Sequence, residues 1–207
     1  MKIIEIARRR RQLYLLTFDS GDPIEVDVRT FDESPYRLGS DITEEQRNTL
    51  LATSCYNRAR DRALYLLGLR DYACKELEQK LYSEADPATA AAVVERLRQV
   101  GLLDDERYAA RVARSLSEVK HYPRRRIEQE LRHRGIDPLT AQTAVEGLES
   151  EDFEQALALL ERKYYNKLND PDSRRRVVAA LARRGFSYGA IRRAFDALDI
   201  PDDEEIT

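Results

Sequence analysis

The chain has 207 residues, 35% of them charged and 42% hydrophobic, and a formal net charge of −3. This length allows one or two domains, and the modest apolar content favours thin helical layers with exposed faces over one thick core. The two cysteines, Cys55 and Cys74, are too few for a disulfide framework or a zinc site, so reduced thiols are expected.

No apolar stretch of the sequence approaches the length that a membrane-spanning helix needs. Four arginines at positions 8–11 interrupt the N-terminus where a signal peptide would have its apolar region. The sequence therefore predicts a soluble, cytoplasmic protein.

Residues 1–40 predict a small antiparallel β-meander of three strands, followed by a connector. Alternation of apolar and polar residues begins near Ile4, a run rich in Leu and Tyr covers Gln12–Phe18, and alternation resumes over Ile24–Val28. We expect the first turn to carry a basic run, which is Arg8, Arg9, Arg10 and Arg11. Two interpretations of this run stay open: it blunts the edge of the sheet, or it adds a phosphate-facing patch.

Residues 41–103 predict a long helix and the first of three three-helix repeats. Thr43 and Gln46 have the spacing of a capping box, which opens a helix over about Glu44–Leu69. Pro87 directly follows an aspartate, so it is expected at the first position of a later helix.

The helical plan returns twice, at a period of about fifty residues, in repeat two (104–150) and repeat three (151–199). The apolar pairs that mark this period are Leu77 and Leu81, Ile127 and Leu131, and Val177 and Leu181. The first loop of repeat three is expected over Asn166–Ser173, and the acidic segment 200–207 is expected to be a disordered tail.

Residues with known preferences for helix ends mark the boundaries within the repeats. Gly101 is expected to end the last helix of repeat one, and either Asp104 or Asp105 to cap the first helix of repeat two. Gly135 and Gly185 are expected to end the two later middle helices.

A repeat of this size buries little surface alone, so stacking on its neighbours must complete the core. The predicted fold class is mainly α. Tandem three-helix repeats would form an elongated, curved, monomeric array with a small N-terminal antiparallel β-meander.

Two arginine clusters recur at the same phase of the repeat. Residues 107–134 hold nine Arg and Lys against three Asp and Glu, a net charge of +6, and residues 153–195 hold ten against four, also +6. The clusters are Arg124, Arg125, Arg126, Arg132 and Arg134, and Arg174, Arg175, Arg176, Arg183 and Arg184.

In a helix, residues seven apart share a face, so Arg125 would lie with Arg132, and Arg176 with Arg183. These positions are either a solvated helix surface or a surface that recognises phosphate or carboxylate groups. Recurrence of Arg in place of mixed Lys and Glu favours recognition, because the guanidinium group makes forked hydrogen bonds.

The sequence offers little for catalysis. His121 and His133 are the only histidines, neither has metal-ligand spacing, and no phosphate-binding loop motif is present. The acidic run Asp104-Asp105-Glu106 could be read as a metal site, but capping and stabilisation of a helix N-terminus explain it better. We therefore predict no catalytic residues, no metal site, no cofactor and no enzymatic activity.

Three motifs of the chain resemble the RecX family. They are Glu76-Leu77-x-x-Lys80-Leu81; Leu97-x3-Gly101-Leu102-Leu103-Asp104-Asp105-Glu106-Arg107-Tyr108-Ala109; and Pro123-x-Arg125-Arg126-Ile127-x-x-Glu130-Leu131-x3-Gly135-Ile136. The resemblance covers about Ala59–Leu198, and Gly101–Ala109 is its most specific part. The chain has Arg70-Asp71-Tyr72-Ala73 where the family usually has Arg-x-Arg-Ser, and Tyr122-Pro123 where Gly-Pro is common.

The resemblance implies a non-enzymatic regulator that binds the bacterial RecA filament and inhibits its ATP turnover and strand exchange, with single- or double-stranded DNA bound weakly. The ten arginines of the two clusters would contact the filament and its DNA. Compared with the usual Arg-x-Arg-Ser, the segment Arg70-Asp71-Tyr72-Ala73 lacks one basic residue and the serine that would cap the next helix of repeat one. The alternative is a helical DNA-binding protein without a RecA target, and comparison of naked with RecA-coated DNA separates the two.

Overall fold

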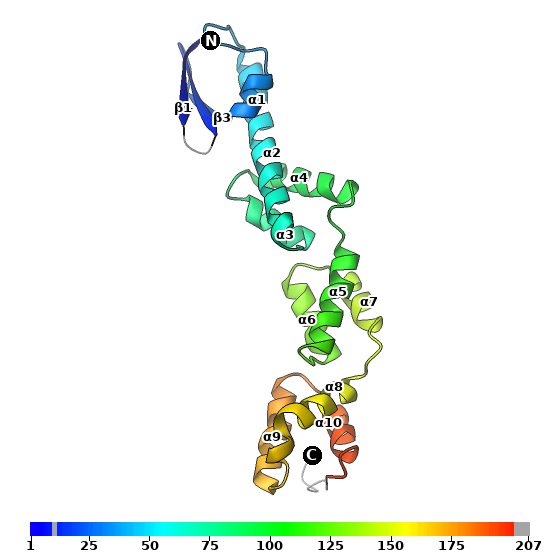
Figure 1. Ribbon diagram of the computed structural model, residues 1–207. Helices are drawn as coiled ribbons and strands as arrows, with labels where there is room; N and C mark the ends of the chain where they lie inside the picture. Colours follow the sequence, from blue (N-terminus) through cyan, green and yellow to red (C-terminus); the bar gives the residue numbers. More distant parts are fainter. Residues whose placement is uncertain (10–11, 201–207) are drawn as a thin grey trace. The chain divides into compact units, whose positions relative to one another are not determined.

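The computed structural model describes residues 1–9 and 12–200, and the chain divides into two compact units, Met1–Leu103 and Asp104–Thr207. The described residues contain one three-stranded antiparallel sheet and ten α-helices (Figure 1). The helices group into three repeats: α2 to α4, α5 to α7, and α8 to α10. The predicted mainly α class with a small N-terminal meander is confirmed.

The sheet has the strand order β1 (Ile3–Arg9), β2 (Leu13–Phe18) and β3 (Ile24–Asp27). The register between β1 and β2 shifts between Ile3 and Glu5, so that two steps along β1 match one step along β2. This β-bulge places Ile3 and Ile6, three residues apart, against the same core, whereas Ile4 is exposed.

The basic run lies differently from the prediction. Arg8 and Arg9 are the last two residues of β1, and not part of the turn, because they continue the ladder opposite Tyr14 and Leu13. Arg10 and Arg11 lie outside the described residues, as does the segment 201–207 of the expected tail.

The third strand is shorter than the predicted alternation. β3 ends at Asp27, and Val28 begins the helix α1 (Val28–Glu33) instead of extending the strand. The Asp27 carboxylate accepts a hydrogen bond from the N–H of Thr30, which caps α1 and ends the extended backbone. A capping side chain therefore overrides the alternating pattern at this point.

The first repeat begins with the long helix α2. α2 spans Glu44–Leu69 behind a capping box of Thr43 and Gln46, as predicted. α3 (Cys74–Leu81) and α4 (Pro87–Gln99) pack beside its second half. The buried core that they share is Ala59, Ala63, Leu66, Tyr72, Leu77, Leu81, Ala90, Val93, Val94, Leu97 and Leu103.

The second repeat contains α5 (Asp105–Glu118), α6 (Arg124–His133) and α7 (Pro138–Glu146), each packed against the other two. Asp104 is the residue that caps α5, through a hydrogen bond from the N–H of Arg107, which decides between the two predicted caps. Gly135 follows α6 in the left-handed region, with φ of 89°, as its predicted role requires.

The third repeat is less regular at its start. α8 (Asp152–Leu159) continues into a π-helical turn, η1 (Leu160–Tyr164), and a 3₁₀ turn, η2 (Tyr165–Lys167). The predicted loop is therefore shorter than expected, because α9 (Pro171–Arg183) already begins at Pro171, behind Asp170 as its cap. The π-helical turn adds one residue to a helical turn and lets Leu160 and Tyr164 both reach the core.

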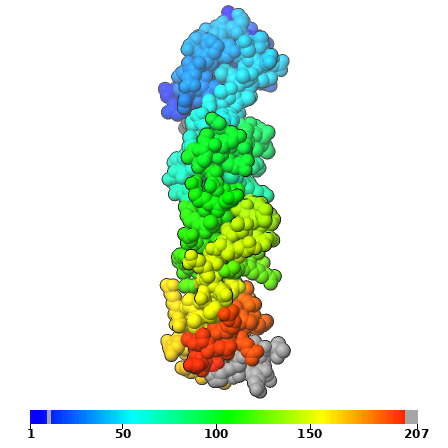
Figure 2. Space-filling view, turned by 90° about the vertical axis from the view of Figure 1, so that its right-hand side faces the viewer, coloured from blue at the N-terminus to red at the C-terminus, as the bar shows by residue number. Residues whose placement is uncertain are grey.

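The last helix, α10 (Tyr188–Asp196), begins behind Ser187 and packs mainly against α8, next to which it lies on the surface in Figure 2. The core of the repeat includes Leu160, Val177, Leu181, Ile191 and Phe195, among others. Ile200, which the sequence assigned to the tail, also packs partly buried against this core.

Candidate functional site

The middle helix α6 turns two predicted arginines to solvent. Arg125 and Arg132 are both exposed, while Ile127 and Leu131 on the opposite side are fully buried. Arg132 forms an ion pair with Glu128 one turn earlier, in which the Arg132 side chain keeps 51% of its surface exposed. An exposed pair of this kind is weak, so the guanidinium group remains available to a partner.

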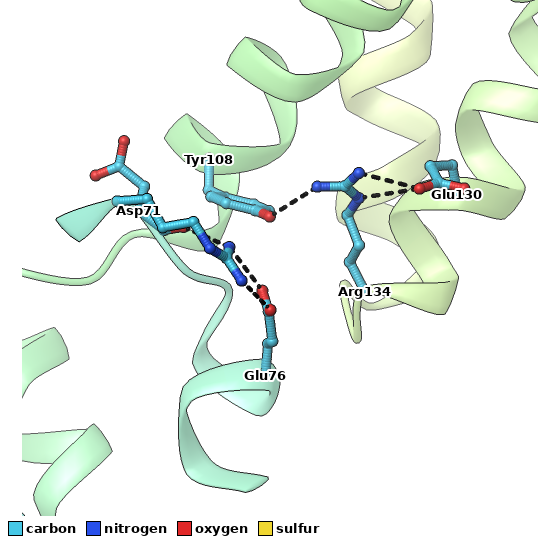
Figure 3. A network of polar contacts seen from close by, with 6 residues as sticks. Asp71, Glu76, Tyr108, Glu130 and Arg134 are labelled. Carbon is cyan, nitrogen blue, oxygen red and sulfur yellow. Dashed lines mark hydrogen bonds and ion pairs between the residues drawn. The ribbon is translucent and has the colours of Figure 1, made fainter. Parts of the chain in front are cut away.

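Arg134, at the end of α6, has contacts within its own repeat (Figure 3). Its guanidinium group donates to the Glu130 carboxylate at 3.0 Å and to the buried Tyr108 hydroxyl at 3.3 Å. The Tyr108 hydroxyl, followed by the Glu130 carboxylate, raises the pKa of Arg134 against the opposing effect of burial. This side chain therefore supports the packing of α5 on α6.

Arg124 is half-buried and also makes contacts within the protein. Its guanidinium group donates to the backbone carbonyls of Leu148 at 2.7 Å and Ser150 at 3.3 Å. Its backbone N–H donates to the Asp152 carboxylate of α8 at 2.8 Å. These bonds join the start of α6 to the segment that enters the third repeat.

Arg126 stacks on Tyr122, with the guanidinium carbon 4.1 Å from the ring centroid. The tyrosine stands where the RecX-like pattern commonly has glycine, and it gives this arginine an aromatic face. Arg126 also borders the third repeat, since a Cβ placed on Gly185 would lie 3.6 Å from the Arg126 Cβ and 3.5 Å from Pro123. The end of α9 thus meets the start of α6.

The arginines of α9 divide in a similar way. Arg174 is half-buried and donates to the Leu168 carbonyl at 3.4 Å, and Arg175 lies 4.0 Å from the Asp172 carboxylate. Arg176 and Arg183 are exposed, seven residues apart on one helix face, as predicted. Arg184 is half-buried at the helix end, next to the Gly185 junction.

We call the exposed residues Arg125, Arg132, Arg176 and Arg183 the basic face. Within residues 1–9 and 12–200, the side chains of three of them make no hydrogen bond or ion pair with the protein: Arg125, Arg176 and Arg183. Gly185 lies close to Pro123 and Arg126, since an added Cβ would be 3.5 Å from Pro123 and 3.6 Å from the Arg126 Cβ, so the two predicted clusters adjoin at the junction of α9 and α6. Chemically, the basic face offers forked cationic donors to anionic groups.

Repeat one carries no comparable arginine cluster at the start of its middle helix, α3. Arg70 forms a two-pronged ion pair with Glu76, which Figure 3 labels, and stacks 3.7 Å from the centroid of the Tyr72 ring. Ala73 precedes α3 without a side-chain cap, as its departure from the family pattern implies. The N-terminal patch contributes Arg8, which donates to the Gln12 side chain at 3.3 Å.

Sequence reasoning missed a group of polar residues at the junction of the second and third repeats. Gln155 is 8% exposed and Ser117 is 2% exposed, and both belong to a hydrogen-bonded network with His121 and Ser150. One signal was available: Gln155 lies four residues before the buried Leu159, so it is a polar residue within an apolar helix stripe.

Among the side chains that the structure describes, no group of three or more His, Cys, Asp or Glu is placed to hold a metal ion. The helices described also include none that is both long and apolar enough to cross a bilayer.

The fold and the basic face define a protein of tandem three-helix repeats with a cationic helix surface. Models of the first, second and third three-helix domains of RecX match residues 59–97, 104–145 and 149–195 respectively. The chain belongs to the RecX family.

Individual relatives agree with this assignment. A regulatory protein RecX from Trichlorobacter lovleyi is 37% identical over 140 residues, which cover 65% of this chain and 91% of the relative. The regulatory protein RecX of Halorhodospira halophila is 39% identical over 149 residues, covering 70% and 90%.

Solved structures agree on the fold. A crystal structure of RecX from Lactobacillus salivarius has a TM-score of 0.64 at 22% identity, and it covers 72% of this chain and 99% of that one. A second crystal structure of regulatory protein RecX has a TM-score of 0.68 at 21% identity, covering 95% and 100%.

Proposed function

We propose that this protein binds the RecA recombinase filament in the cytoplasm and inhibits its ATP hydrolysis and strand exchange without catalysing a reaction itself. The observation that carries the proposal is membership of the RecX family across all three repeats, since the matched relatives are regulatory proteins. RecA is the partner that the motif resemblance implies.

The basic face supplies the contact in this proposal. Its four guanidinium groups project from α6 and α9, whose ends meet at Gly185, so one partner surface can reach both helices. Carboxylates on recombinase subunits and phosphates of the enclosed DNA are both suitable acceptors for forked hydrogen bonds. Binding through several such contacts along a filament would hinder the movements that accompany ATP turnover.

The test compares naked single-stranded DNA with the same DNA coated by RecA, using labelled protein and a parallel ATPase assay. We expect tight binding only to the coated DNA, together with a fall in ATP hydrolysis. If naked DNA is bound equally well and hydrolysis is unchanged, the protein is a DNA-binding helical protein without a RecA target. In that case, four phosphate contacts should give a log–log salt slope of about −3 on single strands.

A further inference from the structure

We propose that a polar network between the second and third repeats is a lock that sets the orientation of α6 relative to α9, and hence the spacing of the basic face. We call it the inter-repeat lock, and its side chains are Ser117, His121, Arg124, Ser150, Asp152 and Gln155. The role of the lock within this chain is independent of the partner. Only its effect on binding rests on the proposed function.

Gln155 is the centre of the lock. Its side-chain nitrogen donates to the Ser150 hydroxyl at 2.7 Å, and its side-chain oxygen lies 2.8 Å from Nδ1 of His121. Because the amide oxygen can only accept, Nδ1 of His121 must carry the donated proton. Ser150 Oγ also lies 3.0 Å from Oγ of the buried Ser117, so the network runs from α5 to α8.

His121 adopts a backbone conformation that indicates a specific role for its side chain. Its φ is +50°, at a position just after α5 where its N–H donates to the Ser117 carbonyl. Glycine is the usual residue for such a left-handed helix end, and another residue there is retained only when its surroundings hold it. The bond between the His121 imidazole and Gln155 is the contact that a glycine could not make.

Two further contacts hold the turn between α5 and α6, one from the segment around the start of α8 and one from the end of α9. The Asp152 carboxylate accepts a hydrogen bond from the backbone N–H of Arg124. In return, the Arg124 guanidinium group donates to the carbonyls of Leu148 and Ser150, which precede α8. Gly185, at the end of α9, packs on the fully buried Pro123. Contacts from both α8 and α9 onto one turn fix an orientation, whereas a single contact would allow rotation.

A partly buried network of this kind, centred on the buried Ser117 and Gln155, is cooperative, because removal of one member leaves the others without partners. The lock should therefore hold one arrangement of the two repeats instead of a range of them. A fixed arrangement presents Arg125 and Arg183 at a defined separation before the partner arrives. Pre-organisation of that kind lowers the entropic cost of binding to a regularly spaced partner.

The decisive measurement is the distance distribution between nitroxide labels at the exposed positions Thr143 on α7 and Ala179 on α9, in a Cys55→Ser, Cys74→Ser background. We expect one narrow distribution for the parent and a broader, displaced one for Gln155→Met, which keeps the volume but removes both hydrogen bonds. Gln129→Met, on the exposed surface of α6, is the matched control and should not change the distribution. The half-inhibitory concentration for RecA ATPase should rise on the order of tenfold in Gln155→Met only.

A second pair of variants keeps the test valid if Gln155→Met fails to fold by circular dichroism. Ser150→Ala should reproduce the broadened distribution, and Ser150→Thr, which retains the hydroxyl, should restore the narrow one. Unchanged distances in the folded lock variants overturn the lock. Changed distances without a change in inhibition overturn its link to the basic face. An absence of inhibition by the parent protein refutes the proposed function but leaves the distance result to decide the lock.

Discussion

The Asp152 carboxylate accepts a hydrogen bond from the backbone N–H of Arg124 at 2.8 Å, across 28 residues of sequence. Arg124 is the first residue of α6, and the preceding Pro123 has no side-chain acceptor to cap that helix. A residue of the third repeat thus performs for the second repeat the capping that is usually local. The two repeats consequently share part of their stability.

Removal of this cap should destabilise the second unit measurably. We expect Asp152→Ala to lower the free energy of unfolding by about 1 kcal/mol, as loss of a helix cap does elsewhere. Asp152→Asn keeps an oxygen acceptor in place and should cost much less. Urea unfolding followed by circular dichroism measures both, and equal losses would show that charge, and not capping, is what Asp152 contributes.

Charge reversal of the basic face should abolish inhibition of RecA while preserving the fold. The variant is Arg125→Glu, Arg176→Glu and Arg183→Glu, whose side chains are exposed and form no hydrogen bond or ion pair with the residues described. Exposed substitutions of this kind shift stability by under about 0.5 kcal/mol each. ATP hydrolysis by RecA on single-stranded DNA is the readout, alongside the melting temperature.

A matched control reverses the same number of exposed helical arginines elsewhere, namely Arg96, Arg107 and Arg114. Arg47 and Arg58 are unsuitable as controls, because their side chains bind the Asp22 carbonyl and Glu84 respectively. The control variant should keep most of the inhibition. Equal loss in both variants would place recognition outside the basic face.

Two glycines near the start of α10 should respond oppositely to alanine. Gly185 has a φ of +100°, so Gly185→Ala should destabilise by about 1–2 kcal/mol through backbone strain. Gly189 is helical with no neighbouring atom within 4 Å of a new Cβ, so Gly189→Ala should stabilise by about 0.5–1 kcal/mol. Chemical denaturation of the two variants gives both values, and a loss of stability in each would contradict this prediction.

The capping aspartates should make the second unit sensitive to acid. The Thr140 hydroxyl and N–H lower the pKa of Asp137, and the Ser173 N–H lowers the pKa of Asp170. A carboxyl group with a lowered pKa in the folded state stabilises the protein above its unfolded pKa of about 3.9, and that contribution disappears as the pH falls through the folded value.

The double variant Asp137→Asn, Asp170→Asn retains acceptors at both caps but no longer titrates. Its urea midpoint should therefore fall less between pH 7 and pH 3 than that of the parent. The same fall in both proteins would mean that other carboxyl groups cause the acid sensitivity.

The sequence predicted the helices well because their ends are determined locally. Thr43 and Gln46, Asp86 before Pro87, and Gly135 act on backbone groups within a few residues, so their spacing is sufficient. The β-bulge near Ile4 and the π-helical turn depend on which side chains reach a core built by distant segments. Neither has a local pattern that distinguishes it from a regular strand or helix.

The site was predicted only in outline for a related reason. Ten arginines look alike in sequence, yet Arg124 and Arg134 bind groups 24 to 26 residues away, and Arg125 does not. Helical periodicity correctly placed Arg176 and Arg183 on a different side of α9 from the buried Val177 and Leu181, because the side on which a residue lies depends only on the geometry of the helix. It could not show which guanidinium groups other segments of the fold would occupy.

The π-helical turn at Leu160–Tyr164 has a consequence for how the chain tolerates changes of length. Such a turn holds one residue more than an α-helical turn, so deletion of the exposed Glu161 could be absorbed by reversion to regular α-helix. α9 is a regular α-helix and has no extra residue to lose. A deletion within it would rotate all later residues of the helix by about 100° and move Leu181 off the core. Related chains that differ by one residue in repeat three should therefore place the gap here.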